Sequence, residues 1–150
     1  MDTPLLSDAG KANFEISVRA LICHRDVDLG IHCLSSLLRF CNDPIKIVLH
    51  DDGSLTKDDA NRLEDGLPNT ILVSKEEADD VVGPQLTRYP RCSAFRARSP
   101  TGQKMFDIPL MAKGDIALCD TDILFLRPFR GVFTWPDSSA DILFLQDTTD

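Results

Sequence analysis

The stretch ISVRALIC-HRD-VDLGIHCLSSLLRFC-NDP-IKIVL, residues 16–49, decides the fold class. Its start, Ile16–Cys23, is a strand candidate because it is a short apolar run closed by polar residues. A helix is expected next, since apolar residues then recur at spacings of three and four: Val27, Ile31, Leu34, Leu38 and Cys41. The turn formers at 42–44 end this helix, and Ile45–Leu49 is the second predicted strand.

The alternation of strand and helix continues after residue 49. Thr56, with Asp59 three residues later, has the pattern of a capping box and predicts the start of a second helix. The apolar side of that helix would carry Ala60, Leu63 and Leu67. A short third strand is predicted over Thr70–Val73.

A second capping-box pattern, Ser74 with Glu77, predicts a third helix that ends at Gly83-Pro84. Its inward side is expected to carry Ala78, Val81 and Val82. Repeated strand and helix predict an α/β fold, a Rossmann-like and mainly parallel sheet with crossover helices.

A further strand is predicted in IALCDTDILFLRP, Ile116–Pro128, where four apolar residues lead to Asp120-Thr121-Asp122 and four more follow. In an extended chain residues i and i+2 point the same way, so Asp120 and Asp122 would converge. Two close carboxylates in apolar surroundings need a neutralising cation. Oxygen ligands suit a hard divalent ion, so this pair predicts a site for Mn²⁺ or Mg²⁺.

Three polar groups follow predicted strands and should therefore share one edge of the sheet, because ligands of parallel sheets bind beyond the carboxyl ends of the strands. They are residues 24–26, residues 51–53 and residues 120–122. Of the three histidines, His32 and His50 are expected to be structural, and His24 could be either a structural or a functional residue.

The motif DDGS, Asp51–Ser54, has a structural explanation as a strand-to-helix turn, because Asp and Gly are common turn residues. Its functional alternative is a carboxylate that accepts hydrogen bonds from a nucleobase or ribose. With DDGS-x-T after the second strand and D-T-D after a later one, the chain resembles nucleotide-sugar-dependent glycosyltransferases of the GT-A fold over about Ile16–Phe129.

The resemblance implies a nucleotide-diphosphate sugar as donor, with uridine as its nucleoside, and an acceptor that the sequence does not identify. Asp51 or Asp52 would contact the base or ribose, while Asp120 and Asp122 would hold the metal ion at the diphosphate. The segment KMFDIP, beginning at Lys104, is similar to the one that precedes D-x-D in several of these families. The implied nucleotide-binding residues are Cys23, His24, Asp51, Asp52, Lys104, Asp120 and Thr121.

In the family a second half carries the acceptor site and, in inverting members, a catalytic base. No residue of this chain can be assigned to those roles, and we expect residues 1–150 to be one nucleotide-sugar-binding domain, truncated before the acceptor half, with a polar leader over residues 1–14. A last strand is predicted at Ile142–Leu145, and Trp135 is expected to serve packing.

The segment Arg88–Lys104 holds five basic residues and no acidic one, although the whole chain has a net charge of −8. One interpretation is a solvated loop, because Pro90, Pro100 and Gly102 disfavour regular structure. The alternative is a mobile basic flap over the diphosphate, in which Arg96 and Arg98 would bind phosphate.

The acidic composition argues against a general nucleic-acid binder or a binder of anionic membranes. Five cysteines without C-x-x-C spacing predict reduced thiols, and with no signal-peptide pattern or transmembrane stretch they favour a cytoplasmic protein. Two other functions remain open. One is a phosphohydrolase of the haloacid-dehalogenase type, with Asp120 as nucleophile and Asp122 as general acid; the other is a sugar-nucleotide-binding fragment without turnover.

Overall fold

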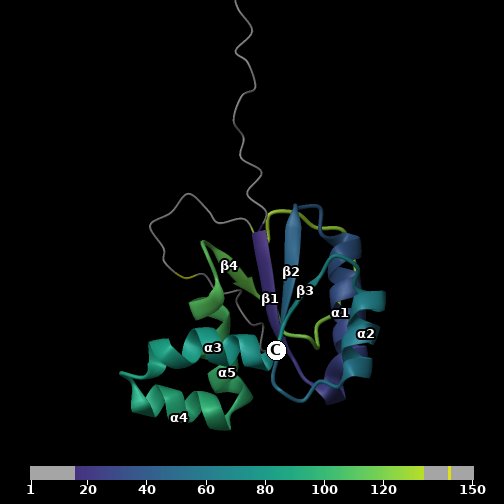
Figure 1. Cartoon of the computed structure of the whole chain (residues 1–150). Helices are drawn as coiled ribbons and strands as arrows, with labels where there is room; N and C mark the ends of the chain where they lie inside the picture. Colours follow the sequence, from purple (N-terminus) through teal and green to yellow (C-terminus); the bar gives the residue numbers. More distant parts are fainter. Residues whose placement is uncertain (1–15, 134–141, 143–150) are drawn as a thin grey trace, which may run out of the picture.

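A computed structural model describes residues 16–133 and residue 142. Its centre is a parallel four-stranded sheet in the order β3-β2-β1-β4 (Figure 1). The strands are β1 (Ile16–Ile22), β2 (Ile45–Asp51), β3 (Ile71–Val73) and β4 (Ile116–Leu118). This arrangement confirms the predicted Rossmann-like α/β fold with crossover helices.

Helices cover both faces of the sheet (Figure 1). A short 3₁₀ turn, η1 (His24–Asp26), leads into α1 (Val27–Phe40), which lies with α2 (Lys57–Gly66) on one face. The other face carries α3 (Lys75–Leu86) and α5 (Pro100–Met111), and α4 (Pro90–Arg98) packs on these two helices. No helix among the described residues is long and apolar enough to cross a membrane.

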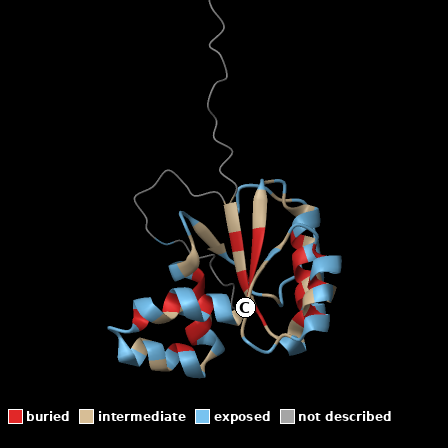
Figure 2. Ribbon diagram, in the orientation of Figure 1, coloured by how far each residue is buried: buried red, intermediate tan, exposed pale blue. Residues whose placement is uncertain are grey.

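The main hydrophobic core lies between the sheet and the α1/α2 layer, where the buried residues of β1, β2 and α1 gather (Figure 2). Val18, Ala20 and Ile22 alternate along β1 and point to this side, as one face of a strand must. Gly30 lets α1 approach the sheet, because a Cβ there would lie 2.5 Å from Cδ1 of Ile22.

Both predicted capping boxes are present, at Thr56 with Asp59 and at Ser74 with Glu77. The predicted end of α3 at Gly83-Pro84 is wrong, since the helix continues to Leu86 with Pro84 inside it. The buried residues of α3 are Ala78, Val82 and Leu86, at a spacing of four. Because Leu86 is buried, the last turn of α3 packs against the rest of the protein. This spacing leaves Val81, which was expected to point inward, 45% exposed.

The basic segment Arg88–Lys104 is helical, so the predicted loop is wrong, while a place of this segment over the diphosphate stays a prediction. Pro90 and Pro100 do not interrupt the helices but begin α4 and α5, where the missing N–H has no helical partner to lose. Gly102 allows the two helices to touch, because a Cβ there would lie 2.5 Å from the carbonyl oxygen of Phe95.

The strand expected within Ile116–Pro128 ends early, at Leu118, and Thr121 and Asp122 form a turn. The chain then runs along α1, where Phe125 N donates to Ser36 Oγ and Phe129 N to the Phe40 carbonyl oxygen. These contacts replace the sheet hydrogen bonds that a longer strand would have made. Ile142 is exposed, while the rest of the predicted strand Ile142–Leu145, Trp135 and the leader lie outside the described residues.

Candidate functional site

The carboxyl ends of β1 and β2 lie side by side, as the parallel pairing of Ile22 with Asp51 requires. Beyond the strands, Asp52 N donates to the Ile22 carbonyl oxygen at 3.1 Å. His24 N donates to Ser54 Oγ at 2.8 Å. Direct hydrogen bonds therefore join the segments that carry the first two polar groups predicted from the sequence.

The DDGS motif forms a tight turn in which each aspartate uses one oxygen. Asp51 Oδ1 accepts from Gly53 N at 2.7 Å and from Leu55 N at 3.3 Å. Asp52 Oδ1 accepts from the backbone N of Ser54 at 2.9 Å and from its hydroxyl. Gly53 has φ +97°, a backbone conformation that glycine adopts at little cost. The structural explanation of this motif is confirmed, and its contact with a base or ribose stays a prediction.

His24 is held by the N-terminus of α2. Its Nδ1 donates to Asp59 Oδ2 at 2.6 Å, and the same buried oxygen accepts from Thr56 N and Oγ1. Hydrogen bonds from the side chain and backbone of Thr56, with a further one from His24, lower the pKa of Asp59 to about 2. The imidazole of His24 is mostly exposed, so Nε2 remains available for a ligand.

Cys23 follows β1 and donates its thiol to Asp26 Oδ2 at 3.1 Å. Burial raises the pKa of this thiol, and the hydrogen bond to Asp26 raises it further. Cys23 is therefore a neutral thiol at pH 7 and not an activated nucleophile. All five cysteines are free, as predicted.

Two consecutive residues of α5 connect the ends of β2 and β4. Gln103 Nε2 donates to the Asp52 carbonyl oxygen at 3.1 Å, and Lys104 forms an ion pair with Asp120. Lys104 is the basic residue that the resemblance implied. No sequence pattern points to Gln103, which lies next to Lys104 on α5.

Two cysteine thiols hold the backbone at the start of the Asp120-Thr121-Asp122 turn. The Asp120 carbonyl oxygen accepts from the thiols of Cys33 and Cys119, each at 3.3 Å. Asp120 and Asp122 are exposed, and Thr121 is half-buried beside Gly30. The argument from an extended chain fails for this pair, because the turn and not a strand sets the directions of the two side chains.

The chemistry of Asp120 and Asp122 fits a hard divalent ion, which takes carboxylate and water oxygens. The ammonium group of Lys104 neutralises Asp120, so a metal ion would compete with it for this carboxylate. Among residues 16–133, no three His, Cys, Asp or Glu side chains are grouped as metal ligands. A metal ion at this turn would therefore complete its coordination with water or with oxygens of a bound ligand.

Arg96, which the flap interpretation placed at the diphosphate, is 7% exposed in the interface of α3, α4 and α5. Its guanidinium is bonded twice to Asp107, which is 1% exposed, and once to Asp79 at 2.7 Å. These partners hold the side chain in the protein interior, and its role is structural. Arg98 is exposed and donates to the Ala94 carbonyl oxygen of its own helix.

Comparison of the sequence with protein-family models found no match, and neither did comparison with curated proteins. The family is therefore not identified by these comparisons. The structure confirms the resemblance only in its architecture, a parallel four-stranded α/β sheet with helices between the strands.

Proposed function

We propose that this chain is the nucleotide-sugar-binding part of a metal-dependent glycosyltransferase of the GT-A type. The observation that supports the proposal is the set of hydrogen bonds that links the carboxyl ends of β1, β2 and β4. His24 bonds to Ser54, next to the second polar group, while Gln103 and Lys104 of α5 bond to Asp52 and Asp120 of the second and third groups.

The nucleoside would bind at the end of β2. Asp51 and Asp52 each commit Oδ1 to the turn, and their other oxygens would accept hydrogen bonds from the base or ribose. Cys23 and His24 would line the same pocket from β1. Uridine is the nucleoside that the sequence resemblance favours.

The diphosphate would bind at the D-T-D turn. A divalent ion on Asp120 and Asp122 would bridge it to the protein and act as a Lewis acid on the leaving phosphate. Lys104 would move from Asp120 to a phosphate oxygen once the metal neutralises the carboxylates, and Thr121 would add a hydroxyl donor. The acceptor and the catalytic base are not assigned.

Thermal unfolding with uridine diphosphate tests this proposal. In Mn²⁺, ligand at a hundred times its dissociation constant should add about 2.7 kcal/mol to the free energy of unfolding and raise Tm by about 5–10 °C. With a chelator the shift should nearly vanish, because the bare carboxylates repel the diphosphate.

Asp120→Asn and Asp122→Asn should each remove the Mn²⁺-dependent shift while leaving the fold intact. Asp115→Asn is the matched control, since this exposed aspartate directly precedes β4 and lies at the amino-terminal end of the strands, away from the D-T-D turn. Unchanged Mn²⁺ dependence in the Asp120→Asn/Asp122→Asn double variant would remove the metal site from the proposal. Hydrolysis of a phosphate monoester that depends on Asp120 would instead favour the phosphohydrolase.

A further inference from the structure

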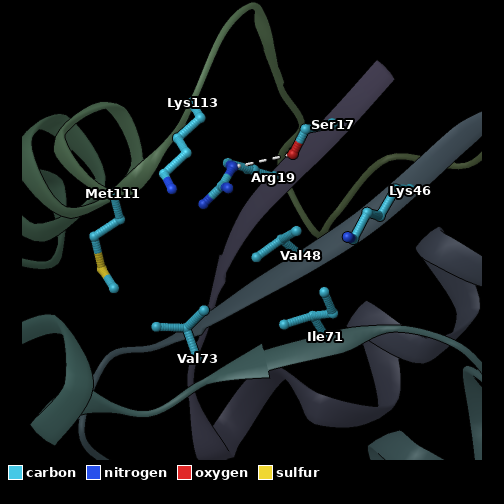
Figure 3. A pocket seen from close by; sticks show the side chains of 8 residues that line it. All are labelled: Ser17, Arg19, Lys46, Val48, Ile71, Val73, Met111 and Lys113. Atoms are coloured by element: carbon cyan, nitrogen blue, oxygen red, sulfur yellow. Dashed lines mark hydrogen bonds between the residues drawn. The ribbon is translucent and has the colours of Figure 1, made fainter. Parts of the chain in front are cut away.

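The face of the sheet that carries α3 and α5 is open around the amino-terminal halves of β1 and β2 and along β3. An open depression of about 380 Å³ lies there (Figure 3). Its lining includes Ser17 of β1, Lys46 of β2 and Ile71 of β3, each at or next to the first residue of its strand. The candidate nucleotide site lies beyond the other ends of these strands, about 20 Å from Ser17 along β1.

Among the described residues that line this depression, three are cations and none is acidic: Arg19, Lys46 and Lys113. Figure 3 shows the guanidinium of Arg19 and the ammonium of Lys113 extending toward one another over the same opening. None of the three takes part in an ion pair within the described part of the chain. This is a concentration of positive charge in a chain whose net charge is −8.

Arg19 is half-buried, and its described partners are neutral. Its Nε donates to Ser17 Oγ at 3.1 Å, and its Nη1 lies 3.0 Å from Nε2 of His50. A guanidinium only donates hydrogen bonds, so Nε2 of His50 must be the acceptor. Burial lowers the pKa of Arg19, as expected for a cation removed from water without a carboxylate beside it.

His50 does not compensate that charge. It is 1% exposed, and burial, with the charge of Arg19, lowers its pKa to about 4. The imidazole is therefore neutral at pH 7. Since Nε2 accepts from Arg19, the proton lies on Nδ1, which has no hydrogen-bond partner among the described residues. Three N–H bonds of the Arg19 guanidinium have no partner among the described residues and could bind a ligand in the depression.

The floor of the depression is apolar. Val48, Ile71 and Val73 come from β2 and β3, and Met111 comes from the end of α5 (Figure 3). An inorganic anion would satisfy the cations but leave this surface in water. A ligand with both a negative group and a hydrocarbon part matches the whole lining.

We propose that this depression is a second ligand site, which binds a small organic anion with an apolar group. The carboxylate or phosphate of the ligand would lie between Arg19 and Lys113 and accept their charge-assisted hydrogen bonds. Its hydrocarbon part would cover Val48 and Val73. The site uses none of the residues of the proposed glycosyltransferase site, so either proposal can fail without the other.

Titration calorimetry with three probes tests the inference. Hexanoate has both parts of the expected ligand, acetate has only the anion, and hexanol has only the apolar group. Hexanoate should bind at least about tenfold more tightly than either control. Equal binding of the three probes, or no binding of hexanoate, would overturn the proposal.

Arg19→Met and Lys113→Met should each weaken hexanoate binding about tenfold or more, the equivalent of one charge-assisted hydrogen bond. Lys113 is exposed after α5, so Lys113→Met tests the role of the cations even if Arg19→Met disturbs the fold through the lost contact with His50. Lys57→Met, which removes the same charge from the N-terminus of α2 on the other face, should leave the affinity unchanged. Equal affinities in Lys113→Met and Lys57→Met would show that the cations of the depression do not bind the anion.

Discussion

The two faces of the sheet are held to their helices by different forces. On the α1/α2 side the contact is almost entirely apolar, with Leu34 and Leu37 fully buried against β1 and β2. On the α3/α5 side the buried groups include Arg96, Asp107 and His50. The first face should respond chiefly to lost volume, whereas the second should respond chiefly to the loss of a buried charge or to protonation.

The largest expected effect comes from breaking the buried ion pair of the second face. Arg96→Met leaves Asp107 buried without its bidentate partner, and should lower the free energy of unfolding by about 3–5 kcal/mol in urea denaturation. Arg98→Met on the same helix should change it by no more than about 0.5 kcal/mol, because Arg98 is exposed. If the two variants were equally stable, the second face would not depend on this pair.

His50 should make the second face sensitive to acid. Its pKa is about 4 in the folded chain and about 6.5 when unfolded, so the unfolded state binds more protons between these values. The stability contributed by the neutral imidazole is complete above about pH 6.5 and falls by up to about 3 kcal/mol as the pH approaches 4. Arg19 adds to this loss, and Asp107 opposes it.

Urea denaturation from pH 7 to pH 4 measures this effect. His50→Gln should flatten the profile in that window, and His32→Gln, at an exposed position of α1, should leave it unchanged. A profile that is as steep in His50→Gln as in the unmodified chain would assign the acid sensitivity to other groups.

A smaller effect is expected from the glycines of the second face. Gly102→Ala should destabilise the fold by about 1–3 kcal/mol, because the new methyl group meets the backbone of Phe95. Gly83→Ala in α3 meets no atom of another element within 4 Å and should change the stability by no more than about 1 kcal/mol, because helix propensity favours Ala while the following Pro84 disfavours a Cβ at this position. A clearly larger loss of stability for Gly102→Ala in thermal unfolding would confirm that close approach of α4 and α5, and not glycine as such, matters.

The first face was predictable because its signals are local. Apolar spacing in α1 and the capping box at Thr56 lie within a few residues of the elements they define. The second face depends on partners distant in sequence: Arg96 meets Asp79 and Asp107 from two other helices, and no local pattern distinguishes it from the exposed Arg98. The prediction of a loop at Pro90 and Pro100 was wrong for a related reason. Proline disfavours the interior of a helix but suits its first turn, and local sequence does not show which of the two applies.

The candidate site was predictable to the same degree. The rule that polar residues gather at the carboxyl ends of parallel strands placed the ends of β1 and β2 together, and these ends are in contact. Gln103 was missed because a helix on the covering layer, and not a strand end, brings it to Asp52. The turn at Asp120 was missed because the shortness of β4 depends on contacts of the following residues with α1.

The strand order has a consequence for the route by which the chain folds. The central strand β1 pairs with β2 about 30 residues away and with β4 about 100 residues away. Closing the longer loop costs more chain entropy, so the β1-α1-β2 unit should assemble first and β4 should dock late. We therefore expect β4 and the turn at Asp120 that follows it to be among the last segments to fold and among the first to unfold. A ligand that binds at this turn would then stabilise its folded form.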